Sequence, residues 1–139
     1  MGRVLAIDFG LRRLGLAVSD PLRLTAQCLP TLEAPKAARL AQLLKLIQEY
    51  QVQEVLIGNP LSKEGLATAM SGRVAKFAAG LRRHVQCEVK LWDERLTSAE
   101  ANRMLRSSGI GLRKRQDAVD RVAATLILQS YLDWRAFNP

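Results

Sequence analysis

The sequence predicts an α/β fold in which a mixed sheet of five strands carries helices on both faces. Near the start, apolar segments at 3–9 and 14–20 are separated by a short polar turn, the spacing of an antiparallel hairpin. Beyond residue 36, segments with helical periodicity alternate with short apolar strands, which favours parallel pairing and helical cover. No repeat, low-complexity segment or linker divides the 139 residues, so we expect one domain over 1–139.

The first half of the chain is expected to supply three strands and a helix. Residues 3–9 hold a continuous apolar run, and 14–20 form its hairpin partner, with a weaker third strand within 25–32. Over 36–50, apolar residues recur at the spacing of one buried helix face; they are Leu40, Leu43, Leu44 and Ile47.

The second half alternates strands and helices. A short apolar strand at 55–58 is followed by an expected helix over 66–84. Alternating apolar residues over 85–91 then predict a strand with one face in the core.

Two further helices are expected towards the C-terminus. Thr97 and Glu100 have the spacing of a capping box, which predicts a helix from there to about residue 107. A last helix is expected from near Asp117 to between Tyr131 and Trp134.

The charge balance points to a polyanionic partner. The chain has 21 Lys and Arg residues against 13 Asp and Glu, a formal net charge of +8. Fifteen of the 21 basic residues are Arg, whose guanidinium group pairs well with phosphate. We therefore expect a nucleic acid partner, RNA or DNA, attracted by the positive field. The alternative is arginine spread over the surface without a specific role.

Composition also excludes several classes of chemistry. The two cysteines, Cys28 and Cys87, lack metal-ligand spacing, and His84 is the single histidine. This argues against a zinc site, a disulfide framework and a histidine-activated nucleophile. No apolar run approaches the roughly 18 residues that span a bilayer, and the N-terminal apolar run is too short for a signal peptide. We expect a cytoplasmic protein without a membrane partner.

Three acidic residues occupy informative positions. Asp8 ends an apolar strand, where an uncompensated charge is costly; Glu94 follows the strand at 85–91; Asp120 lies in the last predicted helix. Each has an ordinary alternative explanation. Asp8 could form a turn hydrogen bond with the backbone, and Glu94 could form a surface ion pair with Arg95 or Lys90. Asp120 could be favoured by the helix dipole in the first turn of its helix. Asp117 competes with Asp120 as a plausible N-cap on much the same helix face.

Together these acids predict a metal site. Open α/β sheets place their sites at the C-terminal ends of the strands, where Asp8 and Glu94 are expected, and the last helix would bring Asp120 there. Clustered carboxylates favour a neutralising cation, and oxygen ligands select Mg²⁺ or Mn²⁺. Two such ions roughly 4 Å apart can promote phosphodiester hydrolysis. Charge and carboxylates thus predict a metal-dependent nuclease.

Three segments resemble the YqgF/RuvX family of Holliday-junction-resolvase-like proteins, which has an RNase H-like fold. The segments are Ile7–Asp20, Asp93–Ser98 and Asp120–Leu132. The resemblance covers nearly the whole chain and implies that Asp8, Glu94 and Asp120 form the catalytic and metal-binding triad. It favours Asp120 over Asp117, because the family's third acid is followed two positions on by small residues. One departure is Gly58-Asn59-Pro60, where the family usually has Gly-Leu-Pro.

The resemblance implies nuclease activity on one of two substrates. These are the precursor of 16S ribosomal RNA, matured at its 5′ end, and Holliday junctions or other structured DNA. Pre-ribosomal particles become candidate partners for the first. A junction resolvase makes two symmetric cuts and needs a homodimer, whereas the sequence leaves monomer and homodimer both open.

Two basic clusters are expected to contact phosphate. Arg113, Lys114 and Arg115 lie in an expected loop, and we expect them to hold the nucleic acid backbone beside the metal site. The alternative is a solvated cationic loop. Arg12 and Arg13, at the hairpin tip next to Asp8, are the second cluster.

Two other functions stay open. A non-catalytic nucleic-acid-binding factor in ribosome assembly or transcription would use the basic residues without the acids. An Asp-x-Gly hairpin also occurs in actin-like ATPases and sugar kinases, but these fold two such domains around a nucleotide, and 139 residues supply one.

Overall fold

The computed structural model describes the backbone of residues 2–96 and 112–139 and the side chains of 2–95 and 122–139. Its strands are β1 (Arg3–Phe9), β2 (Arg13–Ser19), β3 (Ala26–Glu33), β4 (Val52–Asn59) and β5 (Glu88–Asp93). The helices described are α1 (Lys36–Glu49), α2 (Ala69–Arg82) and α4 (Leu112–Phe137), with the short 3-10 helix η1 (Glu94–Leu96) after β5. These strands form one sheet in the order β3-β2-β1-β4-β5, so the predicted five-stranded sheet is confirmed.

The sheet is mixed, and its parallel half brings three strand ends to one edge. β1 and β2 form the predicted antiparallel hairpin, and β3 continues it. β4 runs parallel to both β1 and β5, with Ile7 opposite Ile57 and Gly58 opposite Trp92. The C-terminal ends of β1, β4 and β5 therefore lie together, where open α/β sheets place their sites.

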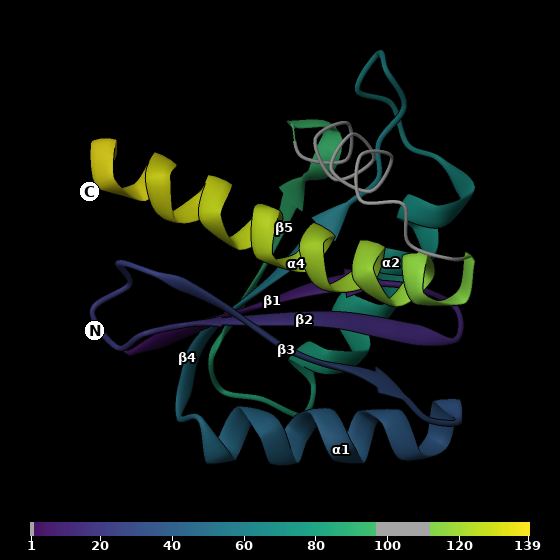
Figure 1. The fold of residues 1–139 in the computed structure, drawn as a ribbon, viewed down its shortest axis with the longest axis horizontal. Helices are drawn as coiled ribbons and strands as arrows, with labels where there is room; N and C mark the ends of the chain where they lie inside the picture. The colour runs from purple at the N-terminus through teal and green to yellow at the C-terminus, as the bar shows by residue number, and fades with distance from the viewer. Residues whose placement is uncertain (1, 97–111) are drawn as a thin grey trace.

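Helices cover both faces of the sheet, as predicted (Figure 1). On one face, α1 and α2 enclose a core that includes Leu5, Ile7 and Ile57. On the other face, α4 packs against Val4 and Leu56. Alternate residues of a strand point to opposite faces, so a strand buried on both sides has a continuous apolar run, as β1 does over residues 4–7.

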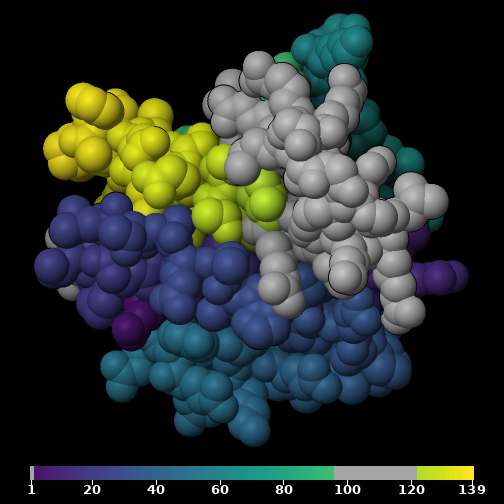
Figure 2. All heavy atoms as spheres, viewed as in Figure 1, coloured from purple at the N-terminus to yellow at the C-terminus, as the bar shows by residue number. Residues whose placement is uncertain are grey.

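The C-terminal helix lies mainly over the hairpin side of the sheet. α4 packs most extensively against β2 and β3, with β1 beneath it. Figure 2 shows the yellow atoms of α4 resting directly on the blue and purple atoms of the N-terminal strands. Within the described ranges, no helix has the length and apolarity needed to cross a membrane.

The largest correction concerns the start of the last helix. α4 begins at Leu112, so the prediction that Arg113, Lys114 and Arg115 form a loop is wrong. Leu, Arg, Lys and Gln all have high helix propensity, and the segment before Asp117 consists of these residues. Asp117 is therefore inside the helix and is not its N-cap.

Other boundaries move by a few residues. β4 begins at Val52, three residues earlier than predicted, and β5 begins at Glu88 instead of Val85. α2 begins after Thr68, whose side chain accepts a hydrogen bond from the backbone N–H of Ser71 in a capping box. The helix predicted over 97–107 lies outside the described residues.

Candidate active site

Asp8 and Glu94 lie at the same edge and on the same side of the sheet. Asp8 has the strand parity of Val4 and Ala6, which face α4. Glu94 begins η1 directly after β5, two residues beyond Trp92, which also packs on the α4 side. The parallel strands therefore bring together two carboxylates that are 86 positions apart in the sequence.

Gly58 in β4 makes room for the Glu94 carboxylate. A Cβ atom on Gly58 would lie 2.8 Å from Oε2 of Glu94 and 2.7 Å from Cδ1 of Ile127 in α4. The Glu94 carboxylate is therefore held over the end of β4, between that strand and α4. The sequence analysis missed this role, although a glycine that ends an apolar strand was a signal of close approach.

The protein environment disfavours the charge of Glu94. Burial raises the pKa of this carboxyl group, and the negative charge of Asp93 raises it further. The two cations proposed for a surface ion pair bind other acids: Arg95 Nη2 lies 2.6 Å from Asp93 Oδ2, and Lys90 Nζ lies 3.2 Å from Glu54 Oε1.

The Asp93–Arg95 pair ties the end of β5 to the loop after β4. Hydrogen bonds from the Arg95 side chain hold the pKa of Asp93 below its ordinary value. Arg95 Nη1 also donates to the carbonyl oxygen of Lys63 at 3.1 Å. The side chains of Asp93 and Arg95, the two neighbours of Glu94 in the sequence, therefore restrain the backbone at Glu94.

Asp120 belongs to α4, and its side chain lies outside the described residues. The helix begins at Leu112, so Asp120 is beyond the first turn, and the helix-dipole explanation for this acid loses its basis. Its membership of the cluster with Asp8 and Glu94 stays a prediction.

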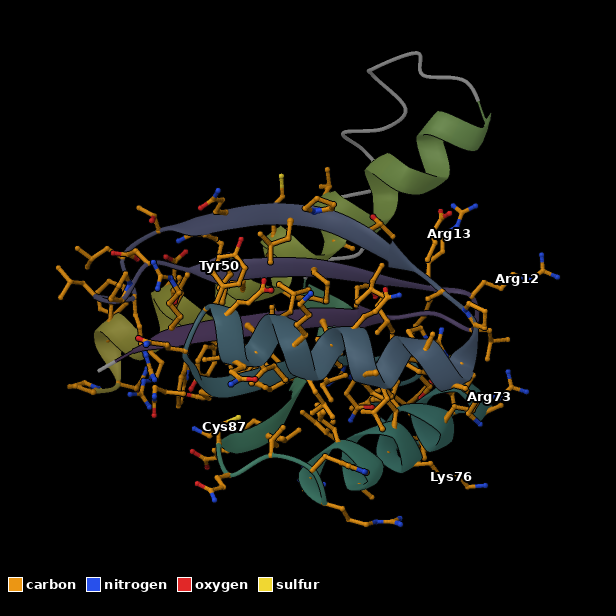
Figure 3. The ribbon with its side chains drawn as sticks, turned by 90° about the horizontal axis from the view of Figure 1, so that it is seen from below. Arg12, Arg13, Tyr50, Arg73, Lys76 and Cys87 are labelled. Carbon is orange, nitrogen blue, oxygen red and sulfur yellow. The ribbon has the colours of Figure 1, made fainter. Side chains whose placement is uncertain are left out.

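The two arginines of the hairpin tip differ in their surroundings. Arg12 is exposed, whereas Arg13 Nε lies 3.0 Å from Glu33 Oε1 of β3. Figure 3 shows both side chains projecting from the same end of the molecule. Arg113, Lys114 and Arg115 lie in the first turn of α4, and their side chains are outside the described part of the chain.

Arg39 of α1, which the sequence analysis did not single out, holds the turn that follows Asp8. This buried side chain donates from Nη1 to the carbonyl oxygens of Gly10 at 3.2 Å and Leu11 at 3.1 Å. The sequence contains a pattern that predicts this burial, because Arg39, Leu43 and Ile47 are spaced four residues apart and therefore lie on the same, buried face of the helix.

The donor chemistry of this edge fits a hard cation. Asp8 and Glu94 offer carboxylate oxygens, which Mg²⁺ and Mn²⁺ prefer. A cation would offset the cost of the half-buried Glu94 charge, and the missing side chain of Gly58 leaves space beside its Oε2. No three potential ligands from Asp, Glu, His or Cys gather among the side chains described, so a third carboxylate would have to come from beyond them.

Comparison with known proteins agrees with this geometry. The chain matches the model of the RuvX family, described as Holliday junction resolvase, over residues 2–134. It is 46% identical over 138 residues to a Koribacter versatilis protein named "Putative pre-16S rRNA nuclease", covering 99% of this chain and 90% of that one. Proteins of the same name from Halalkalibacterium halodurans and Clostridium botulinum are 42% and 39% identical, each over 94% of this chain and 96% of the relative.

Solved structures agree on the fold. RuvC from T. thermophilus, in complex with a Holliday junction substrate, superposes with a TM-score of 0.57 over 97% of this chain and 96% of that one. The sequence identity is 15%, so this likeness concerns the fold alone, and it confirms the RNase H-like architecture. The chain belongs to the RuvX family, a family of nucleases with this fold, as its three characteristic segments predicted.

Proposed function

We propose that this chain hydrolyses phosphodiester bonds of nucleic acid with Mg²⁺ or Mn²⁺, in a two-ion site formed by Asp8, Glu94 and Asp120. The observation that carries the proposal is the meeting of Asp8 and Glu94 at one edge and on one face of the sheet. Gly58 lies between their strands, close to the Glu94 carboxylate. Within the RuvX family, this cluster is the best candidate for the reacting centre.

The residues of this edge have distinct roles in the proposal. Metal ions bound there would supply positive charge for the phosphate oxygens and activate a water molecule. Gly58 and Ile127 confine the Glu94 carboxylate, which limits its motion when it binds a ligand. Arg39 fixes the turn after Asp8, and Arg12 in that turn is exposed for a phosphate of the substrate.

We propose the 5′ end of precursor 16S ribosomal RNA as the first substrate to test. This choice rests on the names of the curated relatives, which cover nearly the whole chain. A four-way DNA junction is the second, because the family is described as a Holliday junction resolvase. The junction requires two symmetric cuts, so this activity would need a homodimer.

The decisive experiment is a cleavage panel with Asp8→Asn. Single-stranded RNA, a precursor 16S fragment, single-stranded DNA and a four-way junction are each incubated with Mg²⁺, Mn²⁺ or EDTA. We expect wild-type cleavage only with a metal, and a rate at least about 10³-fold lower for Asp8→Asn. Asp133→Asn is the control, since this exposed acid of α4 accepts a hydrogen bond from Gln129 at 2.8 Å, within its own helix.

Circular dichroism and melting temperature would establish that both variants are folded. Undiminished cleavage by Asp8→Asn, purified free of other nucleases, would refute the proposed centre. Salt-dependent binding without cleavage of any substrate with either metal would favour the alternative, a non-catalytic nucleic-acid-binding factor in ribosome assembly or transcription.

A further inference from the structure

A groove lies between α1 and α2, on the face of the sheet opposite to α4. Its volume is about 500 Å³, and its lining combines aliphatic, aromatic and basic side chains. The lining residues are Phe9, Leu11, Lys36, Arg39, Leu40, Arg73, Lys76, Phe77, Gly80 and Leu81. None of the three proposed metal ligands lines this groove, and apart from Arg39, which holds the turn after Asp8, its lining residues have no role in the proposed function.

The rim of the groove is positively charged. Lys36, Arg73 and Lys76 are exposed on it, and none of the lining residues is acidic. The sequence of α2 contains three basic residues and no acid, while Glu49, the acid of α1, stands at the far end of that helix. This local excess of cations is complementary to a polyanion.

The floor of the groove is apolar and partly aromatic. The rings of Phe9 and Phe77 lie with centroids 5.0 Å apart, and Leu11 is 57% exposed beside them. The guanidinium group of Arg39 binds the carbonyl oxygens of the turn at Gly10 and Leu11. Cations above an apolar, aromatic floor suit a single strand, whose phosphates meet the rim while its bases contact the floor.

The groove opens at the same edge of the sheet as the carboxylates. α1 leads into β4 and α2 follows it, so both helices have their N-terminal ends at the C-terminal edge of that strand. Phe9 and Leu11, which line the groove, flank the end of β1 just after Asp8. Figure 3 shows Arg73 and Lys76 at the end of the molecule that also carries Arg12 and Arg13.

We propose that the α1–α2 groove binds a single-stranded segment of the nucleic acid substrate, adjacent to the site of cleavage. Lys36, Arg73 and Lys76 contact its phosphates, and Phe9, Leu11 and Phe77 contact its bases. The proposal rests on the proposed function in one respect: the same strand continues past the carboxylate edge. A duplex keeps its bases stacked inside, so it can use only the rim.

The test measures binding in EDTA, where no cleavage is needed. Fluorescence anisotropy with labelled single strands of about 20 nucleotides, in RNA and DNA form, is compared for Arg73→Gln/Lys76→Gln and for Lys45→Gln/Arg83→Gln. The control pair removes the same charge from α1 and from the residue that caps α2, towards the opposite ends of these helices. All four side chains are exposed, so both variants should fold, as melting curves would verify.

We expect the groove variant to bind RNA, DNA or both about 5- to 20-fold more weakly, and the control to stay within about twofold. The magnitude of the slope of log affinity against log salt should fall by about 1.4, since two contacts are lost and each phosphate contact on a single strand contributes about 0.7. Leu11→Ala should also weaken binding, without changing that slope.

Equal losses for the groove and control variants would overturn the proposal, as would an unchanged affinity of the groove variant for both the RNA and the DNA strand. The result is separable from the nuclease proposal. A groove-dependent affinity without any cleavage would refute the nuclease and leave the groove standing. Normal cleavage with unchanged affinity in the groove variant would refute the groove proposal and leave the nuclease proposal intact.

Discussion

Glu54 is buried and Glu94 is half-buried on the α4 side of the sheet, near opposite ends of β4, and their surroundings differ. Glu54 is 3% exposed, lies 3.0 Å from Arg23 Nη1 and 3.2 Å from Lys90 Nζ, and accepts a hydrogen bond from the Tyr131 hydroxyl. Burial alone would raise its pKa, but the hydrogen bonds from Tyr131 and Lys90 outweigh that effect and lower it. For Glu94, burial and Asp93 both raise the pKa.

The contrast distinguishes an acid with structural partners from one that we propose to be catalytic. At Glu54 the fold supplies cations that make the charged form favourable, which ties β4, β5 and α4 together. At Glu94 the fold confines a carboxylate whose charge it disfavours, and groups with perturbed pKa values in such places are typical of functional sites. We expect Glu54 to matter for stability and Glu94 for activity.

The largest expected effect is on catalysis, in Glu94→Gln. We expect cleavage to fall about 10³-fold or more, because a proposed metal ligand is lost. The free energy of unfolding in metal-free buffer should fall by no more than about 0.5 kcal/mol, because the environment disfavours the charge that is removed. Chemical denaturation and initial cleavage rates measure the two effects.

Glu88→Gln, an exposed acid of β5, is the control for Glu94→Gln and should change neither quantity. A Glu94→Gln variant that keeps its activity but unfolds readily would contradict this comparison, because it would show that Glu94 contributes to stability and not to catalysis.

Glu54→Gln should have the converse effect. Removing this charge leaves Arg23 and Lys90 facing a neutral partner, and we expect unfolding to become easier by about 3 kcal/mol. Denaturation with urea at neutral pH measures this. The rate constant for cleavage by the folded fraction should change by less than about threefold, since Glu54 is remote from the carboxylate edge. A loss of rate in fully folded protein would contradict the division of roles.

The pH dependence of stability sharpens the same comparison. The pKa of Glu54 in the folded protein is below its ordinary value of 4.5, so its contribution is present above that pH and is lost as the pH falls through the lowered pKa. The difference in unfolding free energy between wild type and Glu54→Gln should be constant from about pH 7 to 5 and shrink below about 4.5. A difference independent of pH would mean that packing, and not charge, explains the effect.

The smallest expected effect is that of Gly58→Ala. The added methyl group would lie 2.8 Å from Glu94 Oε2 and 2.7 Å from Ile127 Cδ1, so both must move. We expect a loss of about 1–3 kcal/mol in stability and about 10-fold in cleavage. Gly72→Ala in α2 meets no atom within 4 Å and should instead stabilise by up to about 1 kcal/mol. Similar results for both glycines would show that Gly58 does not position Glu94.

Much of the fold could be predicted from local patterns. Hydrophobic periodicity identified β1, β2 and α1 within a few residues, because each buries a face whose spacing is written into its own segment. Asp8 and Glu94 stood out because Asp8 lies at the end of an apolar strand and Glu94 directly follows a strand. The start of α4 was misplaced, since Gly109 and Gly111 were followed by a basic segment that fitted a loop as well as a helix.

The network around Glu54 could not be predicted, because its members come from distant segments. Tyr131 and Glu54 are separated by 77 positions. The strand that contains Lys90 was predicted to have one face in the core, but Lys90 lies on its opposite face and contacts the Tyr131 hydroxyl of α4. The α1–α2 groove could not be predicted for the same reason, since its rim combines Lys36 of α1 with Arg73 and Lys76 of α2, which are distant in the sequence.

The RuvX family, the five-stranded sheet and the acids at the ends of its strands could be predicted from the sequence, because they depend on order and spacing along the chain. The surroundings of Glu54 and Glu94 became known from the three-dimensional arrangement alone. Whether a carboxylate is charged at little cost or at high cost depends on its burial and on the charged and hydrogen-bonding side chains close to it. For Glu54 the sheet brings these side chains from segments that lie far apart in the sequence.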